Sequence, residues 1–218
     1  IALITGRAGS GKSTTLNCIV NEINHTRSGH ILTLEDPVEF VHRHDQCIIS
    51  QREIPMDCPS YVTALRSALR ESPDVILLGE MRDRETTEVT MRAAETGQLL
   101  LSSLHTTGAV NTIDRVVDIF PPEQQPQIRL QLSMVLQAVV SQQLVPDIDG
   151  KPLPVFEIMY MTMASRNMSR ESKTHQLESA IASGGAQGMR TMDMALLDLV
   201  REGKITAETA LEYCNNYE

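Results

Sequence analysis

The sequence predicts an α/β protein, with a core built on a mainly parallel sheet followed by a mainly helical C-terminal portion. Over residues 1–120, short apolar runs alternate with stretches of helical periodicity. This alternation is typical of parallel sheets that helices cover on both faces. Beyond Pro121-Pro122 the pattern is mainly helical. We therefore expect a core over residues 1–120 and a mainly helical portion over residues 121–218.

The composition is that of an ordinary globular protein, and it argues against some classes of function. Of the 218 residues, 41% are hydrophobic and 22% are charged, and the formal net charge is −9. An acidic chain is a poor candidate for broad binding to nucleic acids or anionic membranes. The sequence shows no signal peptide and no apolar run near the roughly 18 residues that a membrane-spanning helix needs. Its four cysteines form no C-x-x-C pair, so neither zinc nor disulfides are indicated.

The first stretch of the chain reads as a strand, a glycine-rich loop and a helix. Residues 1–5 are apolar, residues 6–13 match the pattern G-x-x-x-x-G-K-S, and residues 13–24 have apolar side chains at helical spacing. Such a loop turns backbone N–H groups toward a phosphate, and the dipole of the following helix adds to the attraction. We expect the nucleotide to be bound by Gly6, Ala8, Gly9, Ser10, Gly11, Lys12, Ser13 and Thr14.

Two residues of this loop have specific expected roles. Lys12 would reach the β- and γ-phosphates, and the hydroxyl of Ser13 would bind Mg²⁺. The alternative is a glycine-rich turn with a surface lysine. The strand before the loop and the helix after it favour nucleotide binding over this alternative.

Further strands and helices follow along the core. Residues 30–34 form a short apolar strand that ends in Glu35-Asp36-Pro37, where the proline holds the acidic pair in a turn. Residues 46–51 read as an extended segment, and residues 73–80 are the clearest core strand, closed by a glycine and a glutamate. The other expected core elements are helices over residues 61–71, 84–95 and 110–120 and a strand over residues 98–104.

The C-terminal portion opens with the longest expected helix, over residues 124–141. A turn-rich connection and a short strand over residues 155–159 come next. Helical patterns then lie around residues 164–171, 174–183, 191–201 and 207–214.

Three residues at the ends of expected strands are candidates for the chemistry of phosphate hydrolysis. Glu35 is our candidate for the base that positions the attacking water, and Glu80 for a carboxylate that holds Mg²⁺. His105 follows the strand over residues 98–104, where a γ-phosphate sensor would lie. In parallel sheets, ligands bind at the C-terminal ends of the strands, so these residues are expected near Lys12.

Structural explanations of the same residues remain open. Glu35 and Asp36 would also serve as a turn cap, and Glu80 would also pair with Arg82 or Arg84. A histidine at a strand end is often only a hydrogen-bonded side chain. A second group, His42, His44 and Cys47, resembles a metal site, but we interpret it as a solvated loop.

Together these motifs resemble the secretion ATPases, and within them the retraction motors of type IV pili. Residues 6–14 match the Walker A box, and residues 32–40 resemble the family's Asp box. Residues 78–83 are similar to its atypical Walker B box and residues 97–107 to its His box. Four boxes in the family's order make the resemblance specific. It covers almost the whole chain and corresponds to the C-terminal ATPase domain, a RecA-like P-loop core.

The resemblance implies a function and its machinery. It supports Glu35 as the base, Glu80 as the Walker B carboxylate and His105 as a site residue, with ATP and Mg²⁺ as cofactors. It implies a hexameric ring in the cytoplasm, at the inner face of the cytoplasmic membrane, contacting the membrane only through a platform protein at the pilus base. Nucleic acid is not an expected partner. The family's smaller N-terminal domain would lie upstream of residue 1.

Departures from the family pattern qualify this picture. Gly97-Gln98 stands where the His box usually has Gly-His. The helix over residues 164–171 keeps the basic skeleton of a family motif but has polar residues at two of its apolar positions. Residues 141–157 contain no cysteine. This last observation favours a retraction motor over the pilus-extension and type II secretion ATPases, which carry a four-cysteine zinc insertion there.

Other functions remain as alternatives. Within the superfamily these are a type IV-like secretion ATPase and an accessory pilus ATPase. From other classes they are a nucleic-acid translocating ATPase and a nucleotide switch that binds but hardly hydrolyses. The acidic charge and the lack of an aromatic and basic strip argue against the first of these.

Overall fold

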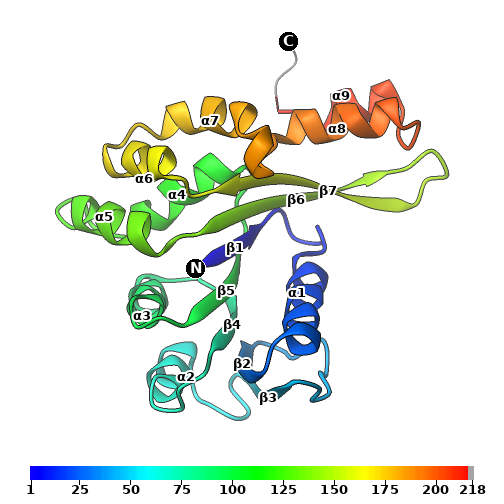
Figure 1. The fold of residues 1–218 in the computed structure, drawn as a ribbon. Helices are drawn as coiled ribbons and strands as arrows, with labels where there is room; N and C mark the ends of the chain where they lie inside the picture. The colour runs from blue at the N-terminus through cyan, green and yellow to red at the C-terminus, as the bar shows by residue number, and fades with distance from the viewer. Residues whose placement is uncertain (216–218) are drawn as a thin grey trace.

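The structure, a computed structural model, describes residues 1–215. In this part of the chain, seven strands form one sheet in the order β3-β2-β4-β5-β1-β6-β7 (Figure 1). All neighbouring strands are parallel except β6 and β7, which form an antiparallel hairpin. The strands are β1 (Ala2–Thr5), β2 (Gly29–Glu35), β3 (Cys47–Glu53), β4 (Val75–Glu80), β5 (Leu99–Leu104), β6 (Ala138–Pro146) and β7 (Pro152–Tyr160).

The helices lie on both faces of the sheet and along its β6–β7 side (Figure 1). Helix α1 covers one face, while α2 and α3 lie on the other. The helices are α1 (Lys12–Thr26), α2 (Tyr61–Ala68), α3 (Arg84–Glu95), α4 (Ala109–Asp118), α5 (Gln125–Val135), α6 (Met163–Arg170), α7 (Leu177–Ser183), α8 (Met192–Arg201) and α9 (Ala207–Tyr213). Two short 3₁₀ helices span Thr174–Gln176 and Gly185–Gln187.

Alternating side chains of the central strands divide the core into two layers, because successive residues of a strand point to opposite faces. On β4, Leu77 packs toward α1 with Leu16 and Val20. Its neighbours Ile76 and Leu78 pack on the opposite face, in the cluster that contains residues of α2, α3 and α4. A third cluster holds α8 and α9 against the β6–β7 hairpin. The buried strands and covered faces confirm the predicted α/β fold with a helical C-terminal part.

One predicted helix is wrong in its second half. The helix expected over residues 124–141 ends at Val135, and the chain continues as β6 from Ala138. Residues 138–141 pair with β1, and Val139 is fully buried there. Pairing with a strand more than 130 positions away outweighs the local helical spacing, since without β6 the strand β1 would be an open sheet edge.

The sheet therefore continues past the expected boundary at residue 120. The short strand expected over residues 155–159 is longer, from Pro152 to Tyr160, and joins the same sheet through β6. The division into units of residues 1–120 and 121–218 stays a prediction. The helices expected near residues 164–171, 174–183, 191–201 and 207–214 are present as α6, α7, α8 and α9, with a 3₁₀ turn before α7.

Parallel pairing brings the ends of four strands to one edge. Thr5 of β1 lies beside Leu104 of β5, and Leu34 of β2 lies beside Leu78 of β4. A register irregularity after Leu78 places Glu80 opposite Ser103. The glycine-rich loop, Glu35, Glu80 and His105 therefore all begin from the same edge of the sheet, as the sequence predicts.

A steric constraint at the first glycine of the loop leads to a test. Gly6 has a φ of +148°, and a Cβ atom there would lie 2.3 Å from the carbonyl oxygen of Gln142 on β6. Gly9 has a φ of +76°, with nothing within 4 Å of such an atom. Both alanine variants strain the backbone, but only Gly6→Ala also clashes with β6. We expect Gly6→Ala to lower the Tm by about 4 °C more than Gly9→Ala does, in calorimetry without nucleotide. Equal shifts would contradict this packing.

Candidate active site

A cleft of about 410 Å³ opens where the parallel strands end. The predicted residues Lys12, Ser13, Glu35, Glu80 and His105 line it together, although they come from four separate segments. The other lining residues come from the predicted loop, from the segments after β2 and β4, from the ends of β4 and β5 and from the start of α2: Ala8, Gly9, Gly11, Thr14, Asp36, Pro37, Glu39, Tyr61, Gly79, Arg82 and Ser103. One cleft thus contains both the glycine-rich loop and the three predicted catalytic side chains.

The glycine-rich loop has a shape that suits an anion. Gly9 and Gly11 have φ values of +76° and +85°, which glycine adopts without the strain that other residues would have. Helix α1 begins at Lys12, directly after the loop, so the positive end of its dipole lies at the cleft. The hydroxyl of Ser10 is buried and has no hydrogen-bond partner among residues 1–215. An open turn with a spare donor beneath it fits a bound phosphate.

Lys12 is folded into its own loop. Its ammonium group donates hydrogen bonds to the carbonyl oxygens of Gly6, at 2.9 Å, and Arg7, at 3.0 Å. It also lies 3.4 Å from Nδ1 of His105. The residue is only 8% exposed, and this burial lowers the pKa of Lys12. The oxygens that accept from the ammonium group are neutral carbonyls. A phosphate group would replace them favourably, because hydrogen bonds between charged groups are stronger.

Glu80 and His105 form one polar chain with Lys12. Nε2 of His105 lies 3.2 Å from Oε2 of Glu80. Burial, followed by the charges of Lys12 and Arg82, lowers the pKa of His105. The imidazole is therefore neutral at pH 7, with Nδ1 accepting from Lys12 and Nε2–H donating to Glu80.

Arg82 is a residue of the site that the sequence reasoning treated only as an open alternative. Its Nε pairs with Oε1 of Glu80, and its guanidinium lies 3.8 Å from Asp36. Arg84, the other candidate partner of Glu80, instead bonds Gln124 and lies over the ring of Phe120. The structure thus contains the Glu80–Arg82 pair inside the cleft, where the arginine adds positive charge beside the carboxylate.

Glu35 is the most buried carboxylate of the cleft. The residue is 6% exposed, and its Oε1 accepts a long hydrogen bond of 3.4 Å from the amide of Gln51. Burial is the largest cause that raises the pKa of Glu35, and the negative charge of Glu39 adds to it. A raised pKa suits a residue that must accept a proton or hold a water molecule at neutral pH. Perturbed carboxylates of this kind are concentrated at functional sites.

Ser13 and Glu39 form a contact that sequence reasoning missed. The hydroxyl of Ser13 donates to Oε1 of Glu39 at 3.1 Å. Glu39 lies four positions after Glu35 in the same acidic segment, which is the signal that the sequence offered. Ser13, the expected Mg²⁺ ligand, thus already contacts an acidic oxygen at the mouth of the cleft.

Tyr61 closes another side of the cleft. A Cβ atom at Gly79 would lie only 3.0 Å from the hydroxyl of Tyr61, so this glycine allows the ring to approach β4. Burial, together with the charge of Asp36, raises the pKa of Tyr61 to about 12. The hydroxyl is therefore protonated at all physiological pH values and available as a hydrogen-bond donor.

His42 and His44, on the loop before β3, and Cys47, the first residue of β3, each make contacts within the protein. His42 bonds the side chain of Asn17 at 2.6 Å, and His44 accepts from the backbone N–H of Ile49 at 3.0 Å. The thiol of Cys47 faces the carbonyl oxygen of Arg27. Each of the three polar groups thus serves to fix the loop.

The polar helix over residues 164–171 corresponds to α6, and one of its arginines has a structural contact. Arg166 donates to the carbonyl oxygens of Ser133 and Met134 and to the side chain of Gln137. These groups lie at the C-terminal end of α5, where a helix has unpaired carbonyls and the negative end of its dipole. Arg166 of this helix therefore fixes the end of α5.

An apolar groove continues from the loop. It lies between α1 and the β6–β7 hairpin and has a volume of about 690 Å³. Its apolar lining includes Cys18 and Ile19 of α1 and Leu144, Pro154 and Phe156 of the hairpin. Gly11 and Thr14 border the groove as well as the polar cleft, so the two hollows meet at the loop.

Comparison with known proteins decides the family. A model of the family described as "Type II/IV secretion system protein" matches residues 1–211. The chain belongs to this family. The match confirms the resemblance that the four sequence boxes indicated.

Members of the family with known names are close in sequence and structure. The type IV pilus retraction ATPase PilT of Pseudomonas aeruginosa is 51% identical over 212 residues, which are 97% of this chain and 62% of PilT. A twitching motility protein of Neisseria gonorrhoeae is 49% identical over 219 residues, 100% of this chain and 59% of that protein. The crystal structure of the pilus retraction motor PilT with bound ADP matches 99% of this chain and 61% of its own, with a TM-score of 0.93 and 46% identity.

The chain thus spans about three fifths of the length of these relatives. The structural match confirms the fold, including the helical C-terminal part. In the part of the chain that the structure describes, no helix is both long and apolar enough to cross a membrane.

The burial of Glu35 predicts a stability effect with a clear pH dependence. Because the folded-state pKa is raised, the ionised carboxylate disfavours folding, and the penalty grows as pH rises through the raised pKa. Glu35→Gln removes the charge but keeps an oxygen for Gln51. We expect this variant to have a higher Tm than the wild type, by about 2–4 °C at pH 7.5, with no difference at pH 4. Calorimetry without nucleotide measures this, and an equal Tm at pH 7.5 would contradict it.

Proposed function

We propose that the protein is an ATP-hydrolysing motor that drives the retraction of type IV pili. The observation that most supports ATP hydrolysis is the composition of the cleft. It combines a phosphate-binding loop with a buried carboxylate, Glu35, and with the linked pair Glu80 and His105. A protein that only bound a nucleotide would need the loop, but not an acidic residue of raised pKa opposite it.

The residues of the cleft fit ATP with Mg²⁺. Gly6, Ala8, Gly9, Ser10, Gly11, Lys12, Ser13 and Thr14 would hold the phosphates, and Ser13 and Glu80 would hold Mg²⁺. When bound, the metal would neutralise charge that develops on the phosphate oxygens. Lys12 would leave its carbonyl partners for the β- and γ-phosphates, in the water-poor position that its burial already indicates.

The side chains opposite the loop have separate roles in this proposal. Glu35 orients the attacking water and accepts its proton. His105, neutral and placed between Lys12 and Glu80, senses the γ-phosphate by a hydrogen bond from its ring. Arg82 holds the carboxylate of Glu80 in place and supplies positive charge near the phosphates. Positioning and electrostatic stabilisation of this kind account for most of the catalysis of phosphoryl transfer.

The apolar groove next to the loop would take the base of the nucleotide. It meets the phosphate cleft at Gly11 and Thr14 and offers apolar contacts on α1 and on the hairpin. Flat apolar walls with few polar atoms are usual where a protein binds a base or another ring system. In this proposal the triphosphate and the base would occupy two connected hollows of one chain.

The motor role is inferred from the named relatives. One is a pilus retraction ATPase and another a twitching motility protein, and the match with each covers nearly all of this chain. We infer a hexameric ring in the cytoplasm, held at the inner face of the cytoplasmic membrane by a platform protein of the pilus base. Because the chain has a net charge of −9, nucleic acid is not proposed as a partner.

The catalytic assignment is tested by two substitutions in the full-length protein. We expect Glu35→Gln to lower kcat by about 10²-fold or more while ATP still binds, because only the group that positions water is lost. Lys12→Ala should weaken ATP binding itself. Steady-state ATPase assays and equilibrium binding of a fluorescent ATP analogue measure these effects.

A matched control is Glu88→Gln, which changes a half-buried glutamate that pairs with Arg92 on α3, outside the cleft. Its kcat should stay within about twofold of the wild type. Turnover of Glu35→Gln at the wild-type rate would show that Glu35 is not the base. Stimulation of the ATPase by single-stranded DNA would instead favour a nucleic-acid motor.

The biological role is tested by deleting the gene. A retraction motor predicts cells that keep abundant surface pili but lose twitching, because pili are still assembled and no longer withdrawn. Expression of the wild-type protein should restore movement, whereas the Glu35→Gln variant should not. Loss of the pili themselves would point to assembly, and normal twitching would point to an accessory or secretion role.

A further inference from the structure

A second buried carboxylate lies on the far side of the His105 loop from the ATP site. Glu157, on β7, is 7% exposed. Its Oε1 accepts a hydrogen bond of 2.6 Å from the backbone N–H of Ala109, and its Oε2 accepts one of 3.2 Å from the backbone N–H of Met192. Ala109 is the first residue of α4 and Met192 the first of α8. One carboxylate therefore holds the N-terminal ends of two helices.

The first of these helices begins directly after the loop that contains His105. Only residues 106–108 separate His105 from the start of α4. The backbone N–H of Gly108 donates to Oγ of Ser141 on β6, at 2.9 Å. Two polar side chains of the β6–β7 hairpin thus fix the end of the loop whose beginning contacts Lys12 and Glu80.

Helix α4 depends on these side chains because it lacks a cap of its own. Its N-cap residue is Gly108, which has no side chain to offer. Helix α8, in contrast, is capped by Thr191, whose hydroxyl accepts from the N–H of Met194 at 3.2 Å. The start of α4 is therefore held from outside by Glu157 and Ser141, whereas α8 has a second, local cap.

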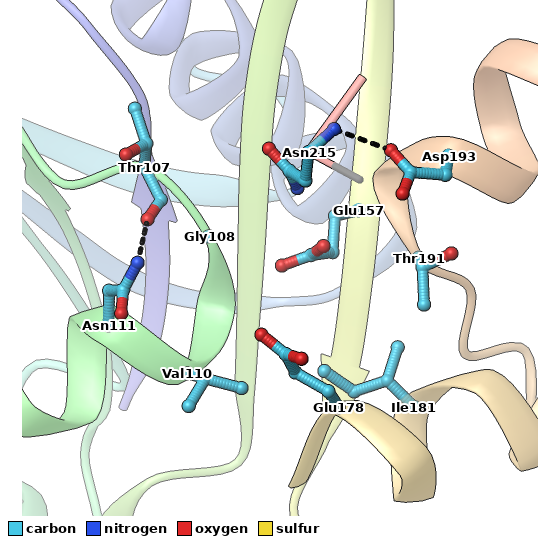
Figure 2. A pocket seen from close by; sticks show the side chains of 10 residues that line it. All are labelled: Thr107, Gly108, Val110, Asn111, Glu157, Glu178, Ile181, Thr191, Asp193 and Asn215. Atoms are coloured by element: carbon cyan, nitrogen blue, oxygen red, sulfur yellow. Dashed lines mark hydrogen bonds between the residues drawn. The ribbon is translucent and has the colours of Figure 1, made fainter. Parts of the chain in front are cut away.

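The surroundings of Glu157 disfavour a charged carboxylate at this position. Figure 2 shows Glu157 between Thr107 and Asn111 on one side and Thr191 and Asp193 on the other, with Glu178 below it. Burial is the main cause that raises the pKa of Glu157, and the charges of Glu178 and Asp193 raise it further. The bonds from the two backbone N–H groups act in the opposite direction. A glutamine of similar size would avoid the charge, but it has one oxygen and would satisfy only one of the two N–H groups.

We propose that Glu157 is a positioning residue for ATP hydrolysis, which fixes the loop of His105 and links it to helix α8 of the C-terminal portion. This rests on the proposed role of His105. The bond to Ala109 sets where the loop after β5 ends, and so where the ring of His105 lies. The bond to Met192 fixes the second oxygen of the carboxylate at the start of α8, so both oxygens of Glu157 are held in place.

The experiment is a double-mutant cycle in the full-length protein, with kcat and KM for ATP measured for the wild type, Glu157→Gln, His105→Ala and the double variant. We expect Glu157→Gln to lower kcat about tenfold while KM changes less than about threefold, because the phosphate-binding loop is untouched. In the His105→Ala background, Glu157→Gln should cause no further loss beyond about twofold. A residue that acts through His105 has nothing left to position once the imidazole is removed.

Thr191→Ala is the matched control, because it removes the local cap at Met194 but leaves both hydrogen bonds of Glu157 in place. It should lower the Tm, since a helix cap is lost, but leave kcat within about twofold of the wild type. If Glu157→Gln does not fold, Ser141→Ala replaces it in the cycle, since it removes only the contact to Gly108. The same dependence on His105 is expected for that variant.

Each outcome is decisive. Equal losses of kcat from Glu157→Gln with and without His105 would show that the carboxylate supports the fold and not the histidine, and would overturn the inference. A loss of kcat in Thr191→Ala as large as in Glu157→Gln would do the same. A His105→Ala variant with the wild-type rate would overturn the proposed role of His105 itself, which the cycle reports separately.

Discussion

The site depends on the parallel pairing of β1 with a strand on each side. Pairing with β5 places His105 next to the start of the glycine-rich loop, and pairing with β6 places Gln142 against Gly6 and Gly11. Parallel strands end at the same edge, so each further strand adds a side chain to one cleft. The β6–β7 hairpin then contributes a second layer, in which Glu157 and Ser141 hold the segment after His105. Sheet order, more than any single side chain, determines which groups meet.

In the cleft, four side chains contact one another in a row, from Lys12 through His105 and Glu80 to Arg82. Lys12 and Arg82 are cationic, Glu80 is anionic, and the neutral ring of His105 lies between Lys12 and Glu80. Glu35 is not part of this row of contacts, and its pKa is raised because burial removes the carboxylate from water. The cleft therefore separates two carboxylates by environment, one paired with cations and one poised to accept a proton. Such a separation of roles is common where an enzyme must hold charge and transfer a proton in the same site.

Much of the core was predictable because its signals are local. The glycine pattern before Lys12 and the apolar strands that end at Glu35 and Glu80 need no distant partner to be recognised. The change from α5 to β6 was not predictable, because β6 is fixed by β1 at the other end of the chain. Arg82 and Glu39 enter the cleft from loops and Tyr61 from the start of α2, and apolar periodicity does not report these positions. Glu157 gave no signal, since its role depends on two helix ends from distant segments.

The most direct test of the cleft as the ATP site is a crystal structure of the full-length protein with Mg²⁺ and a non-hydrolysable ATP analogue. The phosphates should lie in the loop of residues 6–14, with the ammonium of Lys12 moved from the carbonyl oxygens of Gly6 and Arg7 to the β- and γ-phosphates. Mg²⁺ should contact Ser13, and Glu35 should face the γ-phosphate across a water molecule. An analogue bound elsewhere, with Lys12 still bonded to its own loop, would contradict the assignment of this cleft.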